Sequence, residues 1–201
     1  MINLKIFRDY DDIFYSTKNK SLGNAISIID NNEKYHYEFD IRGYEALITT
    51  DYLPLIETAI NEFRKYNKYV NIYFNKDRSF YKAFDEIHTF KLPIKIIQPS
   101  KFFINEKSLN SISSYLEDKE VYLPVCIIND EYVLIDGHAR LLSKYNEDFK
   151  MVNVYLDDYN PNIEEFVYMA KEHNITNITK LEILSDIEYN SFYEKFYKEF
   201  K

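Results

Sequence analysis

The sequence predicts a mixed α/β (α+β) fold, in which a sheet-and-helix domain precedes a second α/β domain and a helical extension. Short apolar or alternating runs, typical of strands, are interspersed with segments whose apolar residues recur at helical spacing. The 201 residues suffice for one large domain or two small ones with buried cores. We place the domains at residues 1–92, 93–160 and 161–201.

The first domain begins with a predicted hairpin. Residues 25–29 and 35–41 are strand-like runs on either side of the polar turn at residues 30–33. Residues 44–49 supply a third strand and residues 69–74 a fourth.

Two helices are predicted in the same domain. Residues 53–66 carry apolar residues on one helical face, with Asp51 as a plausible N-cap and Pro54 in the first turn. Residues 79–87 predict a short helix capped by Ser79.

The second domain alternates strands with helices. Its elements are, in order, a strand at 91–97, a helix at 106–116, strands at 123–128 and 132–135 around a turn at 129–131, a helix at 138–145, and a strand at 151–156. This order predicts a sheet with helices packed against it.

The last part of the chain is predicted to be helical. Residues 163–173 form one helix, and Thr179 with Glu182 has the spacing of a capping box for the next. Ile178 and Ile183 complete that signal as a hydrophobic staple. The final helix carries an aromatic stripe, which we interpret as a docking face on its own domain or on a second copy, hence a homodimer: Tyr189, Phe192, Tyr193, Phe196, Tyr197 and Phe200.

Composition limits the classes of partner. The chain has 25 basic and 33 acidic side chains, a formal charge of -8, which disfavours nonspecific binding to nucleic acid or anionic lipid. The one cysteine, Cys126, cannot form an internal disulfide, and no signal-like or membrane-spanning stretch is present in the sequence. We expect a cytoplasmic protein without membrane partners. The four histidines show no zinc spacing with cysteine, so we expect no zinc.

The junction after the second hairpin has the parts of a phosphate site. An apolar strand ends in Asp136 and Gly137, and a helix begins at once with His138, Ala139 and Arg140. Free amides and the dipole at a helix start attract anions, Gly137 permits close approach, and His138 and Arg140 can donate hydrogen bonds. The alternative is that Asp136 simply caps the helix and that His138 and Arg140 are solvated first-turn residues.

The order of these elements resembles the ParB/sulfiredoxin-like family over about residues 94–156. The family commonly writes this junction as Asp-Gly-His-x-Arg after a hairpin, and Asp136, Gly137, His138 and Arg140 match that pattern. The helices that follow resemble a C-terminal extension of some bacterial members. Residues 35–97 are faintly similar to half of a GNAT-type acetyltransferase, but the glycine-rich pyrophosphate loop is missing, so acetyl-CoA binding is not expected.

The resemblance implies nucleotide binding followed by one of several activities. Some members use CTP to switch a DNA clamp, but no basic helix-turn-helix module follows Leu156, so we do not expect sequence-specific DNA binding. Others reduce a cysteine sulfinic acid with a cysteine that here falls at His138. Cys126 lies in the preceding strand, where a buried, inert thiol is expected, so that chemistry is not expected either.

A third branch phosphorylates free serine and resembles the junction best. It implies that Asp136 lies near Mg²⁺ and the phosphates. The family's glutamate after the early proline is absent, since Pro99 is followed by Ser100 and Lys101, which we assign to phosphate contact. Glu106 is the candidate base, although we favour its interpretation as a first-turn acid stabilised by the helix dipole.

Two interpretations therefore stay open. One is a Mg²⁺-dependent phosphotransferase or hydrolase using ATP or CTP, with Asp136, Glu106 and His138 as catalytic candidates. The other is a regulatory or interaction protein whose junction senses a nucleotide or phosphorylated small molecule, or is vestigial.

Overall fold

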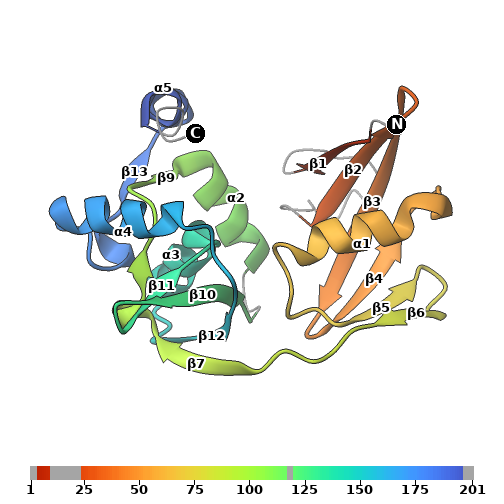
Figure 1. The fold of residues 1–201 in the computed structure, drawn as a ribbon, viewed down its shortest axis with the longest axis horizontal. Helices are drawn as coiled ribbons and strands as arrows, with labels where there is room; N and C mark the ends of the chain where they lie inside the picture. The colour runs from red at the N-terminus through yellow and green to blue at the C-terminus, as the bar shows by residue number, and fades with distance from the viewer. Residues whose placement is uncertain (1–3, 10–23, 117–119, 197–201) are drawn as a thin grey trace. The chain divides into compact units, whose positions relative to one another are not determined.

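The chain forms two compact units, Met1–Ile87 and His88–Lys201, which are considered in turn. The computed structural model describes residues 4–9, 24–116 and 120–196 (Figure 1). Helices and mixed sheets both occur, which confirms the predicted α+β class.

The first unit contains a six-stranded sheet. Its strands run in the order β1 (Lys5–Asp9), β2 (Ala25–Asp30), β3 (Glu33–Arg42), β4 (Glu45–Thr49), β5 (Ile72–Asn75) and β6 (Phe80–Ala83). Neighbours are antiparallel except β4 and β5, which are parallel because the chain crosses over through a short 3-10 turn, η1 (Leu53–Leu55), and helix α1 (Ile56–Arg64).

Helix α1 lies across one face of this sheet (Figure 1). Its apolar residues recur at helical spacing, so Ile56, Ala59, Ile60 and Phe63 are all buried. Phe63 stacks on Phe39 of β3, with ring centroids 4.1 Å apart. This contact identifies the sheet face on which the core of the first unit lies.

The predicted hairpin is confirmed. Its turn places Asn31 and Asn32 at positive φ, the conformation that two-residue hairpin loops require and that asparagine tolerates. Pro54 lies in the first turn as predicted, but Asp51 is not the cap: η1 begins after Tyr52, and no side chain caps it or α1.

The short helix predicted at residues 79–87 is wrong. Phe80–Ala83 is instead strand β6, paired antiparallel with β5. A tight turn makes the difference, because the Arg78 amide donates to the Asn75 carbonyl at 2.8 Å and the Asn75 amide donates to the Ser79 carbonyl at 2.9 Å. The chain therefore reverses before a helix can begin, and Ser79 bonds with Asp77 within the turn.

The second unit is built on a five-stranded mixed sheet. Its order is β7 (Thr89–Pro93), β12 (Met151–Leu156), β10 (Tyr122–Ile128), β11 (Glu131–Leu134) and β8 (Gln98–Pro99). Strand β9 (Phe103–Asn105) pairs separately with β13 (Glu182–Leu184). The helices are α2 (Glu106–Leu116), α3 (His138–Asn146), α4 (Asn162–Glu172) and α5 (Asp186–Phe196), with 3-10 turns η2 (Ile94–Ile96) and η3 (Ile178–Lys180).

Both faces of the β10–β11 hairpin are covered. Side chains alternate between the faces of a strand, and here they separate into two clusters. One cluster joins Leu123, Val125 and Leu134 to buried leucines of α2 and α3. The other joins Cys126 and Val133 to Val167 of α4. The strand, turn and helix predicted at residues 123–145 are confirmed by β10, β11 and α3.

The capping box predicted at Thr179 and Glu182 is wrong. Thr179 lies inside η3, whose N-cap is Asn177, and Glu182 begins strand β13. A capping box does occur six residues later, where the Ser185 amide donates to Glu188 Oε2 at 3.1 Å at the start of α5.

Helix α5 docks on its own unit through Phe192, whose ring centroid lies 5.2 Å from that of Phe103. The rest of the predicted stripe, from Tyr193 to Phe200, lies outside the side chains that the structure describes. Among the described residues, no helix is long and apolar enough to cross a membrane.

Candidate functional site

The predicted junction is present between β11 and α3. Ile135 still pairs with the sheet, donating to the Pro124 carbonyl at 3.0 Å, and α3 begins three residues later with Gly137 as its N-cap. The Leu141 amide is bonded to the Gly137 carbonyl, and no side chain caps the helix. The first-turn amides therefore have no capping acceptor in the described part of the unit, as expected of an anion site.

Gly137 is required at this position for two reasons. Its φ is +88°, in the left-handed region that L residues with a Cβ rarely adopt. An added Cβ would lie 2.6 Å from Leu123 Cδ2 and 2.9 Å from Arg140 Nε. The side chains of Leu123 and Arg140 thus both occupy the space next to the Gly137 Cα, where a Cβ would otherwise lie.

His138 is buried, with 4% of its surface exposed, which excludes the alternative of a solvated first-turn residue. The Ser100 amide donates to its Nε2 at 3.0 Å, so Nε2 is an acceptor and a neutral ring carries its proton on Nδ1. Burial lowers the pKa of His138 far below its ordinary value, the charges of Lys101 and Arg140 lower it further, and Asp136 opposes them. The ring is therefore neutral at pH 7.

The Nδ1 atom of His138 is buried and has no hydrogen-bond partner in the described structure. As the protonated nitrogen of a neutral ring, it is a donor without an acceptor. Orphaned buried donors are rare and costly, by about 1–3 kcal/mol each. This atom marks the helix start as a place where an acceptor is missing.

Ser100 uses its donors within the protein. Its amide holds His138, and its hydroxyl donates to the Leu134 carbonyl at 2.6 Å. The side chain is buried, with 5% exposed. Ser100 therefore orients the imidazole and joins β8 to β11, and it has no proton left to offer a phosphate.

Asp136 does not cap the helix. It accepts a hydrogen bond from Arg140 Nη2 at 3.3 Å, an ion pair across one helical turn. The side chains are 34% and 16% exposed, so this pair lies at the surface end of the junction. Ala139 and Lys101 are half-buried there as well, and Lys101 is near enough to depress the pKa of His138.

Glu106 is not brought into this group. It is the exposed first residue of α2, and among the described residues it makes no hydrogen bond or ion pair. The helix is capped instead by Asn105, whose Oδ1 accepts from the Ser108 amide at 3.0 Å. The structure thus joins Ser100, Lys101, Asp136, Gly137, His138, Ala139 and Arg140 in one region and leaves Glu106 as an acid in a helix first turn.

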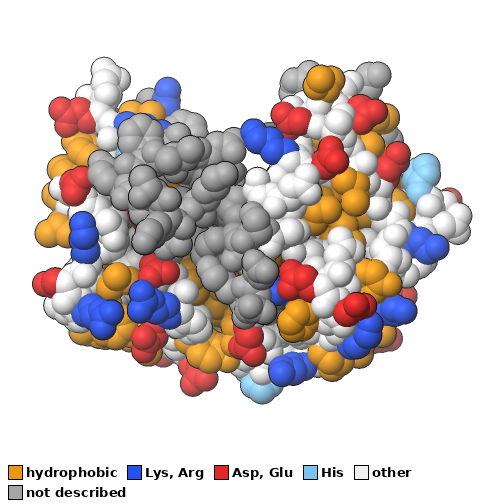
Figure 2. Space-filling view, turned by 180° about the vertical axis from the view of Figure 1, so that it is seen from behind, with side chains coloured by type: hydrophobic (Ala, Val, Ile, Leu, Met, Phe, Trp, Pro, Cys, Tyr) orange, Lys and Arg blue, Asp and Glu red, His pale blue; other side chains and the backbone are white. Residues whose placement is uncertain are grey.

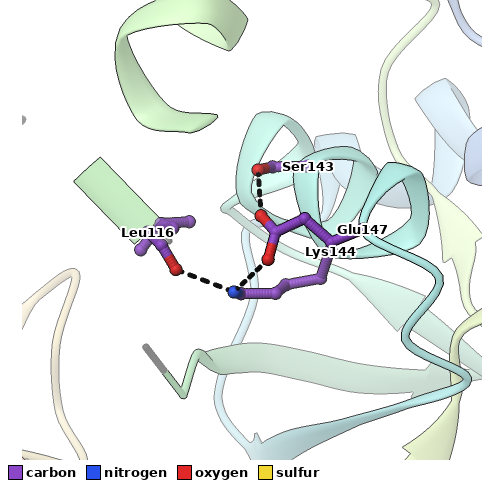
Figure 3. Close-up of polar contacts among 4 residues, drawn as sticks. All are labelled: Leu116, Ser143, Lys144 and Glu147. Atoms are coloured by element: carbon purple, nitrogen blue, oxygen red, sulfur yellow. Dashed lines mark hydrogen bonds and ion pairs between the residues drawn. The ribbon is translucent and has the colours of Figure 1, made fainter. Parts of the chain in front are cut away.

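Lys144, which was not predicted from the sequence, links the helix of the junction to α2. Its Nζ donates to the Leu116 carbonyl at the end of α2 at 2.8 Å and to Glu147 Oε2 at 2.7 Å (Figure 3). Ser143 donates to the other oxygen of Glu147 at 3.0 Å. A cation at a helix C-terminus satisfies free carbonyls and the dipole. The signal in the sequence was a lysine three residues after Leu141 and three before Glu147.

The described residues contain no group of three or more His, Cys, Asp or Glu side chains that could hold a metal ion. Cys126 is buried and its Sγ lies 3.8 Å from the Val133 carbonyl, while burial raises its pKa to about 11. The predicted burial of Cys126 is therefore confirmed, and a raised pKa disfavours the reactive thiolate at neutral pH.

Comparisons with known proteins found distant structural neighbours. No family model matches the chain, and no curated protein matches it. Among solved structures, protein Atu1540 from Agrobacterium tumefaciens aligns with a TM-score of 0.38 and 16% identity, over 48% of this chain and 62% of that one. A truncated chromosome-partitioning protein ParB from Caulobacter crescentus, complexed with CTP-gamma-S, aligns with a TM-score of 0.33 and 18% identity, over 44% of this chain and 53% of that one. The chain spans less than two thirds of either neighbour.

Proposed function

We propose that this chain binds the phosphate group of a nucleotide or another phosphorylated small molecule at the start of α3. The observation that carries the proposal is the buried, unpartnered donor on His138 Nδ1, at the first residue of a helix whose opening amides have no cap. Phosphate oxygens are acceptors that satisfy both kinds of donor. A helix N-terminus alone would be weaker support, because many such ends are hydrated.

Arg140 supplies the charge for this site. Its guanidinium lies over Gly137, within reach of the helix start, and can form forked hydrogen bonds with a phosphate. In the structure it is paired with Asp136, so an incoming anion competes with that carboxylate. The half-buried Lys101 adds a second positive charge nearby.

Asp136 is the residue that would hold Mg²⁺. Magnesium is usually bound by one or two carboxylates together with phosphate oxygens and water, so a single aspartate beside a phosphate site fits it. A cation on Asp136 would weaken the carboxylate's hold on Arg140. We therefore expect Mg²⁺ to strengthen binding of a phosphate-bearing ligand.

Binding without turnover is the version that the geometry favours. Phosphoryl transfer needs a positioned base or orienting group. Glu106 is exposed and its side chain makes no hydrogen bond or ion pair with a described residue, and His138 Nε2 already accepts from the Ser100 amide. A phosphotransferase or hydrolase using ATP or CTP is the second version, and turnover is what separates the two.

The test is calorimetric titration of the full chain with pyrophosphate, ATP and CTP, with and without Mg²⁺. Arg140→Gln should weaken binding about tenfold or more, as expected when a charge-assisted hydrogen bond is lost. Lys150→Gln is the matched control, since Lys150 is 75% exposed and pairs only with exposed Asp148 at 3.6 Å. Equal affinities for the Arg140 variant and the parent would refute the site.

Turnover is measured on the same preparations with labelled ATP or CTP and Mg²⁺. We expect binding without release of phosphate or transfer to added serine. Turnover that is lost in Asp136→Asn would replace the sensing version with the enzymatic one, while leaving the binding site in place.

A further inference from the structure

A separate pocket lies in the first unit, on the sheet face opposite α1. It measures about 190 Å³ and is lined by Asp40, Arg42, Glu45, Leu47, Phe74 and Arg78. Pockets for drug-sized ligands measure roughly 300–1,000 Å³, so this one suits a molecule smaller than a nucleotide. It shares no residue with the junction at Gly137.

The strand register explains why this face has an apolar floor. Leu47 is paired with Asp40 on β3 and with Phe74 on β5, so the three side chains form one row across the sheet. Ile48, the next residue on β4, points the other way and is buried with Phe39 against α1. Within the described residues of the first unit, α1 is the only α-helix, and it leaves Leu47 and Phe74 uncovered by a helix.

Two of the four charged groups around this floor neutralise each other. Arg42 donates from Nε at 3.2 Å and from Nη2 at 2.9 Å to the same oxygen, Oδ2, of Asp40. The side chains of the remaining two, Glu45 and Arg78, make no hydrogen bond or ion pair with any described residue. The pocket therefore presents one unpaired carboxylate and one unpaired guanidinium.

These two groups lie at opposite ends of the floor. Glu45 is two residues before Leu47 on β4, which places its Cα about 7 Å away along the strand. Arg78 lies in the turn that follows β5, which is parallel to β4, so it lies beyond Phe74 in the strand direction opposite to Glu45. A ligand that pairs with both must carry a cation and an anion separated by an apolar body.

Arg78 adopts a backbone conformation that is unfavourable for most residues with a side chain. Its φ is +66°, in the left-handed region, and the turn is fixed by hydrogen bonds between Asn75 and Ser79 and between Asp77 and Ser79. Glycine or asparagine adopts this conformation more readily than arginine. The turn therefore presents a long cationic side chain from a fixed backbone site beside the pocket.

We propose that this pocket binds a zwitterion of dipeptide size, with its carboxylate on Arg78, its ammonium on Glu45 and an apolar side chain over Leu47 and Phe74. An α-amino acid carries its two charges on one carbon and does not span the floor. A phosphate ester offers nothing for Glu45 and is repelled by it. The ligand class is thus set by the sign and separation of the two unpaired groups.

The test titrates the full chain with the dipeptide Ala-Phe, with its N-acetylated form and with its C-terminal amide. The free dipeptide should bind about tenfold more tightly than either blocked form. Arg78→Gln should remove the preference for the free carboxylate while keeping the preference for the free ammonium, and Glu45→Gln should do the reverse. Lys76→Gln, an exposed lysine in the same turn, is the matched control and should bind like the parent.

Three results would overturn the proposal. The first is no binding of Ala-Phe at millimolar concentration, the second is equal binding of the free and blocked forms, and the third is equal effects of Arg78→Gln and Lys76→Gln. Because Glu45 and Arg78 are exposed, both variants should keep the parent's unfolding midpoint, which separates a lost contact from a lost fold.

Discussion

Replacing Gly137 by alanine is the sharpest test of the geometry at the junction. The left-handed backbone, with φ at +88°, costs a residue with a Cβ roughly 1–2 kcal/mol. The new Cβ would also lie 2.6 Å from Leu123 Cδ2 and 2.9 Å from Arg140 Nε, and forced overpacking of this kind costs roughly 1–3 kcal/mol. We expect Gly137→Ala to lower the free energy of unfolding of the second unit by about 2–5 kcal/mol.

Gly43→Ala is the matched control for the backbone term alone. Gly43 also has a positive φ, +62°, but an added Cβ there meets no atom within 4 Å. We expect a loss of about 1–2 kcal/mol, from conformation only. Hydrogen–deuterium exchange measures the loss of stability separately in each unit. The amides of β10 and β11 report on Gly137→Ala, and those of β2 and β3 report on Gly43→Ala. Equal losses in the two variants would refute the close approach of Leu123 and Arg140 to Gly137.

Three further predictions follow from buried polar groups. Lys144→Met should lower the free energy of unfolding by about 2–3 kcal/mol in urea denaturation, because Leu116 and Glu147 lose a charged partner. Lys150→Met should change it by less than about 0.5 kcal/mol. Equal effects of the two substitutions would contradict a role for Lys144 in stabilising α3. Because the folded-state pKa of His138 is lowered, the unfolded chain binds the extra proton, so stability should fall below about pH 6.5 by up to ~1.4 kcal/mol per pH unit. That slope should flatten in His138→Asn and persist in His173→Asn. Cys126, whose pKa is raised to about 11 by burial, should resist iodoacetamide at about pH 8 until the protein is denatured, and rapid labelling of the folded protein would contradict its burial.

The sequence predicted the elements with strong periodicity. The hairpin of β2 and β3, the helix α2 and the run from β10 to β12 all occur where their patterns indicated. These segments combine an uninterrupted apolar pattern with turn residues at their ends, so local propensity and burial agree.

Two elements were mispredicted because tertiary pairing outweighed a local signal. Residues 79–87 have apolar residues at helical spacing, yet the turn at Arg78 returns residues 80–83 to β5 as a strand. Thr179 and Glu182 have the spacing of a capping box, yet Glu182–Leu184 pairs with β9, far away in the sequence. A pairing partner nearly eighty residues distant (103 against 182) leaves no trace in a local window.

The site was predicted only in part. Gly137, His138 and Arg140 were identified from one short motif, but the motif does not show that the imidazole is buried and turned toward Ser100. The unpartnered Nδ1 atom of His138 and the hydrogen bond from Lys144 to α2 cannot be derived from the spacing of residues in the sequence. Both depend on how segments distant in the sequence pack together. The unpaired side chains of Glu45 and Arg78 beside Phe74 could not be predicted from the sequence for the same reason.

On the face that Figure 2 draws, acidic and basic side chains are interspersed over the described atoms, without a broad basic area.

The central claim is that the hydrogen-bond donors at the start of α3 bind an anion. NMR of the isotope-labelled protein tests this claim most directly. During titration with pyrophosphate, we expect the amide signals of His138, Ala139 and Arg140 and the Nδ1 proton of His138 to shift together, with one dissociation constant. The shifts should weaken in Arg140→Gln and be unchanged in Lys150→Gln. Signals that stay in place at millimolar pyrophosphate, or shifts that ignore the loss of Arg140, would contradict the claim.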